Sequence, residues 1–369
     1  MHNVRGFSLG LAGAVLAASA LAGIAANPVA GALVDRIGGR PTLAIALVLL
    51  AVGFGLYPLI REPWHAFALA LVSGAGNGTF WPSQSALLAG LTPAARRHGA
   101  YSVQRVSRNL GLGVGGATGG FIATTDDPTS FAIIFLLDAV TFLVYLGVLT
   151  HVPEPTKAAR EMAGPTRYIE VLRDRALVGV VGLNALYVAS GYAVWELLPV
   201  FAKNEASVSE RQIGLIFLVN TLVIVVLQLP ITKLLEGRRR MKALAAMTAI
   251  WAAALLVVFA GGLWFEASAA AAVFALAAVI FGLGECFHGP TQAPLVADLA
   301  PERLRGRYMA LGSLSWEVGF LLGPGVGGVV LGAEPLALWP LAAFVCLLAG
   351  AGALALERGI PRELRLTPA

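Results

Sequence analysis

Apolar stretches, each about as long as a lipid bilayer is thick, recur from one end of this 369-residue chain to the other. A helix needs roughly 20 apolar residues to cross a hydrocarbon core about 30 Å thick, so each stretch can span a membrane once. The composition agrees, because 57% of the residues are hydrophobic and only 13% are charged, whereas soluble domains carry about 25% charged residues. The sequence therefore predicts an all-α polytopic membrane protein and excludes a water-soluble globule.

The net charge of +5 does not indicate a nucleic-acid partner, because the basic residues lie in short loops between apolar stretches and form no basic face. The two cysteines, Cys286 and Cys346, lie inside apolar stretches and indicate neither a disulfide framework nor a metal site. The sequence has no phosphate-binding loop with its lysine and no nucleophile elbow. We therefore expect no enzyme, no cofactor and no ATP-driven pump.

Charge clusters, glycines and prolines divide the chain into eleven predicted spans, for which we expect helices. These spans are 8–34, 42–60, 64–91, 99–125, 129–151, 176–202, 211–235, 243–261, 269–299, 304–332 and 335–356. Lys and Arg concentrate in one set of alternate loops, among them the loop with Arg36 and Arg40. The positive-inside rule places these loops and the C-terminus in the cytoplasm. We expect the chain to lie in the plasma membrane.

An internal repeat relates the two parts of the chain. Residues 74–93 align with 282–301 at an offset of 208, and without a gap 109–120 fall on 317–328. Parallel repeats of this kind are typical of secondary transporters. The sequence predicts an N-terminal half (1–151), a linker (152–175) and a C-terminal half (176–369).

The repeat also predicts a missing helix. Near the start of the chain an offset close to 202 fits better, and it leaves the span 176–202 without a counterpart in the first half. We therefore expect eleven of twelve helices here, with the first one lost through a misassigned start or a real truncation.

The stretch GALVDRIGGRP, residues 31–41, resembles the signature loop between the second and third helices of the major facilitator superfamily. Gly39 stands where that family usually has a basic residue, and the matching positions are Gly31, Leu33, Asp35, Arg36, Gly38 and Arg40. The resemblance implies a two-half bundle holding equivalents of helices 2 to 6 and 7 to 12. It also implies that Asp35 is a conformational latch that meets the cytoplasmic ends of neighbouring helices across the two halves, where helix N-termini carry partial positive charge. The alternative is a plain turn whose charges only set topology.

A glycine series resembles the fifth-helix signature of the family's drug efflux branch. Its residues are Gly111, Gly115, Gly119 and Gly120, with Gly116 where that branch has proline. The resemblance implies exchange of drugs for protons, although Ala70 replaces the arginine that the family carries in its fourth helix. Close helix packing is the simpler interpretation of the glycines. The run GLGVGG also fits a dinucleotide fingerprint, but no strand precedes it.

Ionisable residues inside spans are costly, so they mark candidate coupling sites. Glu285 and His288 lie three residues apart on one helix face, and each can carry a proton at that depth. Glu317 and Glu196 are the other candidates for proton coupling. A structural hydrogen bond is the alternative for each.

Two further sets of residues are candidates. The buried basic residues Arg105 and Arg108 either anchor at the membrane surface or pair with Glu317 or Glu285. Candidate substrate contacts, several with aromatic rings that suit lipophilic cations, are Asn77, Trp81, Gln84, Tyr192 and Trp195.

These features together predict a secondary transporter working by alternating access, with proton-coupled efflux of small hydrophobic or cationic compounds as the preferred function. Its expected partners are a small-molecule substrate, protons and the lipid bilayer, and we expect a monomer. Uptake by proton symport is one alternative. A non-transporting sensor or scaffold derived from a transporter is the other, which the missing helix favours.

Overall fold

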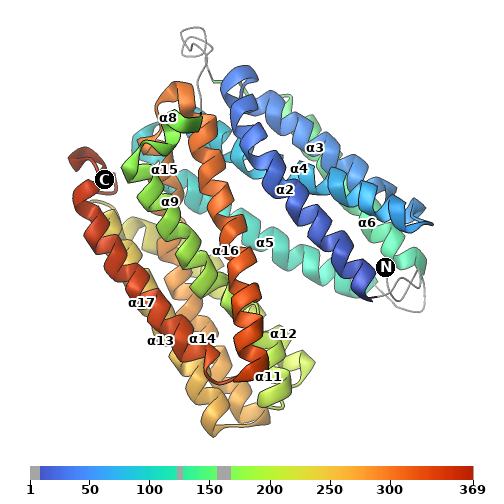
Figure 1. Ribbon diagram of the computed structural model, residues 1–369, viewed down its shortest axis with the longest axis vertical. Coiled ribbons are helices and arrows are strands. Elements are labelled where there is room, and N and C mark those ends of the chain that lie inside the picture. Colours follow the sequence, from blue (N-terminus) through green and yellow to red (C-terminus); the bar gives the residue numbers. More distant parts are fainter. Residues whose placement is uncertain (1–8, 123–127, 156–167, 369) are drawn as a thin grey trace. The chain divides into compact units, whose positions relative to one another are not determined.

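The computed structural model describes residues 9–122, 128–155 and 168–368, and over these residues the chain is mostly helical (Figure 1). The helices of the first half are α2 (Leu9–Ile37), α3 (Gly39–Leu56), α4 (Pro63–Leu91), α5 (Arg97–Ile122) and α6 (Pro128–Leu149). The short helix α8 (Tyr168–Leu172) precedes the second half.

The second half begins with one broken span, made of α9 (Arg175–Tyr187), a π-helical turn (Val188–Tyr192), α10 (Ala193–Trp195) and α11 (Leu198–Glu205). The helices α12 (Glu210–Leu234) and α13 (Arg240–Trp264) follow. Next come α14 (Ala267–His288), α15 (Gln292–Leu299), α16 (Arg305–Ala333) and α17 (Leu338–Leu356).

Local sequence explains several helix boundaries. Gly38 has a φ of 107°, a backbone conformation that favours glycine, and it separates α2 from α3. The Asp174 side chain accepts hydrogen bonds from the first amides of α9. Ser209 and Gln212 form a reciprocal capping box at the start of α12. Each of these residues therefore fixes where a helix begins.

Within the described residues, nine segments are long and apolar enough to cross a membrane, judged by length and composition. These nine coincide with predicted spans. The two remaining predictions, 64–91 and 99–125, fall on helices α4 and α5. Every predicted span is thus helical where the structure describes it, and the predicted all-α membrane fold is confirmed.

The chain divides into two compact units. Unit 1 consists of Met1–Leu91, Val114–Val171 and Ala300–Leu314, and unit 2 of Thr92–Gly113, Leu172–Leu299 and Ser315–Ala369. The units follow the predicted halves except that the first parts of α5 and α16 each group with the other half. The division at a linker over 152–175 stays a prediction, and residues 156–167 of that linker lie outside the described residues.

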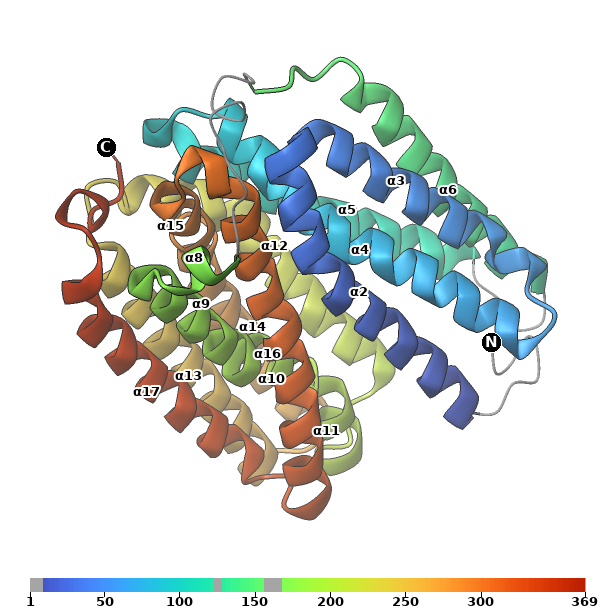
Figure 2. The same cartoon turned by 45° about the horizontal axis from the view of Figure 1, so that its top comes forward.

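In unit 1, α2 packs along α4, and α3 packs against both α4 and α6 (Figure 2). The core between α3, α4 and α6 is formed by Leu43, Leu47, Leu87 and Leu149. The contact between α2 and α4 is lined by small residues, since a Cβ added to Gly74 or Gly78 would overlap the backbone of α2. Glycine at these positions therefore allows the two backbones to touch.

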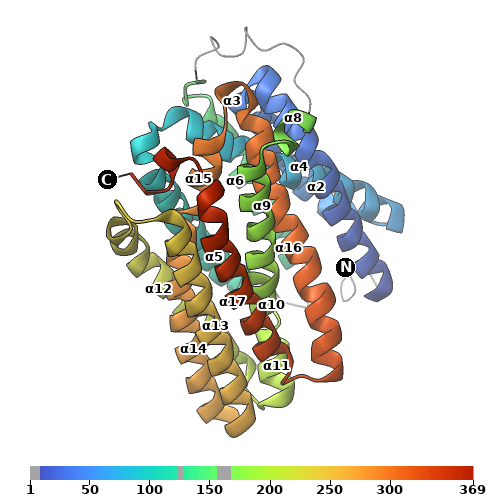
Figure 3. The ribbon, with the colours of Figure 1, turned by 60° about the vertical axis from the view of Figure 1, so that its left-hand side comes forward.

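In unit 2, α13 packs against α14 and α17, while α12 packs on α14 and α9 on α17 (Figure 3). Large rings fill this core, and Trp251, Trp339 and Phe274 are fully buried. The second-repeat glycines Gly319 and Gly323 bring α16 close to the broken span, with Gly319 against Val188. These contacts hold the π-helical turn between α16 and α13.

Candidate functional site

Asp35 lies near the C-terminal end of α2, against the first turn of α16, and both segments belong to unit 1. The amide of Gly306 donates to Asp35 Oδ1 at 2.6 Å, and Arg307 Nη1 donates to Oδ2 at 2.5 Å. The first amides of a helix have no partner within it and carry partial positive charge, so a carboxylate is favoured there. Asp35 therefore lies at a helix N-terminus, as the latch prediction requires, while its role as a latch stays a prediction.

Gly31, one turn before Asp35, allows α2 and α16 to approach closely. A Cβ at Gly31 would lie 2.6 Å from the Cβ of Ala310 and 2.9 Å from the carbonyl oxygen of Gly306. The same substitution at Gly306 would collide with the carbonyl of Gly31. A larger residue at either position would separate Asp35 from the helix N-terminus.

The turn after Asp35 is held by a residue that sequence reasoning missed. The Glu154 carboxylate accepts hydrogen bonds from the amides of Gly39 and Arg40, at 3.2 and 2.8 Å, and so caps α3. Gly39 itself is buried, and a Cβ there would meet Leu87 at 3.1 Å. That contact explains glycine at this position. No local sequence pattern indicates Glu154, because it lies 115 residues from the amide it binds.

Tyr168 is a second missed residue at this site. Its hydroxyl donates to the carbonyl of Pro28 at 2.5 Å, and the guanidinium of Arg307 lies over its ring, 5.4 Å from the centroid. Burial raises the pKa of Tyr168 to about 12, so the hydroxyl keeps the proton that it donates. Of the remaining residues of the predicted loop, Leu33 is half-buried and Arg36 is exposed.

A buried ion pair forms the polar centre of unit 2. Arg105 of α5 pairs with Glu285 of α14, and the same guanidinium nitrogen donates to the hydroxyl of Tyr192 at 2.6 Å. Asn220 of α12 donates to the other carboxylate oxygen of Glu285 at 3.2 Å. Of the two pairings left open by the sequence, the structure forms the one between Arg105 and Glu285.

Small and polar residues hold α5 and α12 beside this pair. A Cβ at Gly289 would lie 2.9 Å from the Cδ atom of Arg105, so glycine leaves the space that the arginine side chain fills. Thr232 and Ser102 hydroxyls bond at 2.7 Å between α12 and α5. The space at Gly289 and the bond between α12 and α5 therefore both help to position Arg105.

His288 is buried one turn after Glu285 and takes part in a separate hydrogen-bonded chain. Its Nε2 lies 2.7 Å from Asn184 Oδ1, and the amide nitrogen of Asn184 donates to Ser315 at 2.7 Å. The Asn184 oxygen faces the ring, so the tautomer of His288 that has its proton on Nε2 would donate to it. Asn184 and Asn220 were missed, although an amide inside an apolar span is itself a signal of a polar contact.

Aromatic rings surround the two polar groups. Trp195 stacks on Phe281 with centroids 4.4 Å apart, and Trp251 stacks on the same ring at 5.0 Å. Tyr192 contacts Trp251 at 4.7 Å and Trp316 at 4.9 Å. The predicted substrate residues Tyr192 and Trp195 thus belong to one aromatic cluster beside Glu285, which we call the aromatic cluster of unit 2.

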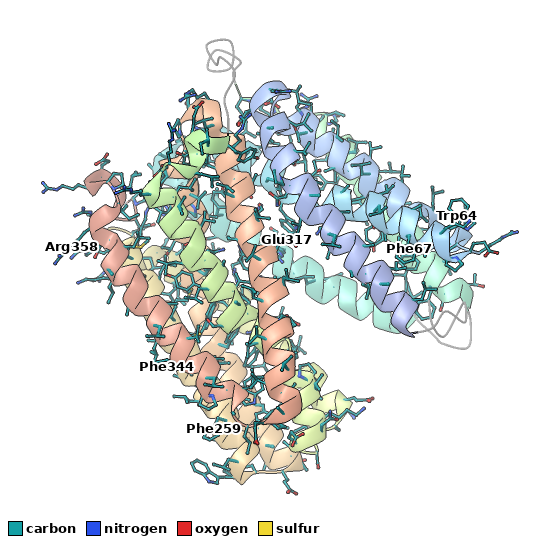
Figure 4. All side chains as sticks on the ribbon, viewed as in Figure 1. Trp64, Phe67, Phe259, Glu317, Phe344 and Arg358 are labelled. Carbon is teal, nitrogen blue, oxygen red and sulfur yellow. The ribbon has the colours of Figure 1, made fainter. Side chains whose placement is uncertain are left out.

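The other candidates lie elsewhere or are more exposed. Gln84 of unit 1 donates to the Tyr145 hydroxyl at 3.0 Å, Trp81 is half-buried and Asn77 is exposed. Figure 4 shows Glu317 on α16, where it is half-buried. Arg108 and Glu196 are exposed. Their predicted roles stay predictions.

The first-repeat glycines lie within α5. A Cβ at Gly111 or Gly115 would meet no described atom within 4 Å. For Gly116, Gly119 and Gly120 the surroundings lie outside the described residues. The close-packing prediction for this series stays a prediction.

A second buried charge cluster in unit 2 joins three helices. Asp298 of α15 accepts from Arg97 and from Arg240, each at 2.6 Å. The side chains of Arg240 and Asp298 are almost fully buried. This carboxylate therefore bonds to two arginines and offsets one of their two charges, which would otherwise be costly to bury.

Comparisons with known proteins agree with this architecture. The family model described as Major Facilitator Superfamily matches residues 1–194 and, again, residues 180–368. The multidrug resistance protein MdtH of Yersinia enterocolitica is 27% identical over 305 residues, which are 81% of this chain and 72% of that protein. A Na(+), Li(+), K(+)/H(+) antiporter of Planococcus maritimus is 23% identical over 354 residues, 86% of this chain and 81% of the relative.

Among solved structures, the proton:xylose symporter XylE has a similar fold. Its structure, bound to 6-bromo-6-deoxy-D-glucose, matches with a TM-score of 0.73 at 16% sequence identity. The match covers 97% of this chain and 88% of that one. At this identity the likeness is one of fold alone.

Proposed function

This chain belongs to the major facilitator superfamily, and on that premise we propose that it exports small hydrophobic or cationic compounds across the plasma membrane in exchange for protons. The observation that carries the proposal is the ion pair between Arg105 and Glu285 in the helical core of unit 2. Ionisable groups within membrane spans are costly and mark ion and substrate pathways.

Glu285 is the proposed proton carrier. Protonation of this carboxyl removes its charge, and breaking a buried pair by removing one partner costs about 3–5 kcal/mol. Arg105 retains an acceptor in that state, because it also donates to the hydroxyl of Tyr192. Proton binding at Glu285 therefore releases Arg105 toward Tyr192 and couples the proton to a movement of the broken span. In this scheme His288 positions Asn184, and Glu317 and Glu196 are secondary candidates.

The aromatic cluster of unit 2 is the proposed contact for the transported compound. Rings within about 6 Å of a cation attract it, and the attraction is strongest where water is excluded. A lipophilic cation resting on Trp316 or Tyr192 would compete with the proton for the carboxylate of Glu285. The relatives' names, a multidrug resistance protein and a cation/proton antiporter, support this substrate class and this direction of exchange.

Asp35 is the proposed latch of one conformational state. Its contacts with Gly306 and Arg307 form where α2 meets the start of α16, and they would break when these helices separate. The positive-inside pattern supports a cytoplasmic position for this contact and for the C-terminus. We propose that the chain acts as a monomer.

The test is flux in proteoliposomes that hold a pH gradient, with a fluorescent lipophilic cation as the transported probe. Wild type should move the probe against the proton flow and collapse the gradient when the probe is added. Glu285→Gln should abolish the gradient dependence while the protein stays folded. The matched control is Glu357→Gln, which removes another buried ion-paired carboxylate, bonded to Arg239 at 2.6 Å. Equal coupling in wild type and Glu285→Gln would refute the role of Glu285.

The direction of flux separates the alternatives. Movement of probe and protons in the same direction would replace exchange by symport. No probe-dependent proton movement and no thermal stabilisation by any compound would favour a sensor or scaffold.

A further inference from the structure

Asn27 on α2 is an unusual buried residue in unit 1. Only 1% of its surface is exposed, and neither its side-chain nitrogen nor its oxygen has a hydrogen-bond partner among the described residues. Buried amides almost always have partners, because burying one without any is costly. An unpartnered amide in the middle of a helix contact therefore points to a polar group that meets it there.

The contact between α2 and α4 tells what Asn27 faces. Gly74 packs against the carbonyl of Ser19, and Gly78 packs against the carbonyl of Gly23. From the first of these contacts to the second, the residue number rises by four on both helices. The two helices are therefore parallel, and their contacts keep the same register (Figure 2). Continued by four more residues on each helix, this register places Asn27 level with Pro82.

Pro82 leaves a carbonyl without its helical donor at that level. Proline has no amide hydrogen, so the carbonyl four residues earlier, that of Gly78, loses the bond that an α-helix would give it. Asn27 directly precedes Pro28 in α2, which likewise leaves the carbonyl of Ile24 without its donor. Two backbone acceptors and one side-chain amide thus lie within about one turn of each other.

Neighbouring hydroxyls do not serve these acceptors. Thr79 donates to the carbonyl of Ala75 at 2.8 Å, and Ser83 donates to the carbonyl of Thr79 at 2.7 Å. Both hydroxyl hydrogens are therefore directed to other carbonyls of α4. A donor to the carbonyls of Gly78 and Ile24 therefore has to be a group other than the hydroxyls of Thr79 and Ser83.

We propose that a bound water molecule joins α2 to α4 at this point, accepting from the Asn27 amide and donating to the carbonyls of Gly78 and Ile24. A buried water typically makes about three hydrogen bonds to otherwise unsatisfied groups. Here it accepts one from the Asn27 nitrogen, and its two hydrogens serve two of the three acceptors, the carbonyls of Gly78 and Ile24. The two proline breaks then share one ligand. A bend at Pro28 and a bend at Pro82 are coupled through it, and Asn27 is the residue that holds it.

The first test is the order of thermal stability of two variants of the full chain in detergent. Leucine has the branched shape of asparagine, a larger volume and no polar atom, so Asn27→Leu expels the water and leaves both carbonyls without a donor. Asn27→Ala leaves room for the water. The site predicts a lower Tm for Asn27→Leu than for Asn27→Ala. The opposite order, expected of a dry apolar contact in which leucine fills space better, would overturn the proposal.

A double-mutant cycle identifies the partner. Pro82→Ala restores an amide hydrogen to the Gly78 carbonyl, so Asn27→Leu should lower the Tm clearly less in that background than in wild type. The control is Pro230→Ala, which alters a proline inside α12 of unit 2. Asn27→Leu should lower the Tm by the same number of degrees with and without Pro230→Ala. Additivity in the Pro82 cycle would overturn the pairing of Asn27 with Pro82.

Two further measurements decide the ligand, and the first uses the wild-type chain alone. Wild-type density at high resolution should show a water within hydrogen-bond reach of Asn27 and the Gly78 carbonyl, and empty density there would refute the site. A Tm that rises with sodium chloride but not with choline chloride, and only when Asn27 is present, would replace the water by a sodium ion.

Discussion

Replacement of Asp35 by asparagine is the sharpest test of the latch, because it removes one charge and almost no volume. Asp35 and Arg307 are each only 5% exposed, with their atoms 2.5 Å apart. Breaking a buried pair by removing one partner costs about 3–5 kcal/mol. Asparagine can still accept from Gly306, so the lower value of about 3 kcal/mol applies. A tenfold change in an equilibrium corresponds to about 1.4 kcal/mol, so the latched state should become roughly a hundredfold less favoured.

Thiol labelling can measure that change. Ala310 is buried beneath Gly31 at the latch, so a cysteine placed there reacts only when α2 and α16 separate. Cys286 and Cys346 are free and buried, and both would be replaced by alanine in the background chain. In this background Asp35→Asn should raise the labelling rate of Ala310→Cys by up to about a hundredfold.

Two controls distinguish latch opening from general loosening. Arg36→Gln alters the exposed neighbour of Asp35 and should leave the labelling rate unchanged. A cysteine at Ala353, fully buried in α17 of unit 2, should label at the same slow rate with and without Asp35→Asn. If Asp35→Asn changes neither rate, or raises both equally, then the pair does not act as a latch.

Three other contacts give predictions that thermal unfolding can check. Glu154→Ala should remove the cap of α3 and cost about 1 kcal/mol, while Glu154→Gln should recover part of the lost Tm; equal losses would show that capping is not its role. Asp298→Asn should lower the Tm strongly, because Arg97 and Arg240 then lose their common buried carboxylate; a change near zero would contradict the pairing. Thr367→Pro removes the amide that donates to the Arg238 carbonyl at 2.8 Å and should cost about 1 kcal/mol more than Thr367→Ala, whereas equal Tm values would assign no stability to that bond.

Several elements of the fold could be predicted from the order of residues. Every span predicted from apolar length is helical in the described residues, and the family inferred from GALVDRIGGRP is confirmed. The break at Gly38 lies between two helices, as the glycines of that loop indicate. These features depend on residues close together in the chain, where periodicity and turn chemistry are informative.

The candidate site was predicted less completely, and the missed residues show why. Glu285 and Arg105 could be suspected individually, because a charge inside an apolar span is conspicuous. Their pairing could not be predicted, because the sequence left two possible carboxylate partners for Arg105. One of them, Glu285, lies 180 residues from Arg105 in the chain. Glu154 and Tyr168 gave no signal, because a glutamate and a tyrosine within a polar linker are ordinary.

The order of residues alone predicts that this protein is helical, lies in a membrane and is built from a repeated half, because helix formation and membrane insertion depend on local hydrophobicity and backbone hydrogen bonding. Which charges meet depends on how the helices pack. Glu285 contacts Arg105, Asp35 contacts the start of α16, and Gly78 meets the backbone of Gly23. These contacts depend on how far each helix is rotated and shifted against its neighbour, and glycines at the crossings set that register over distances that no local pattern records.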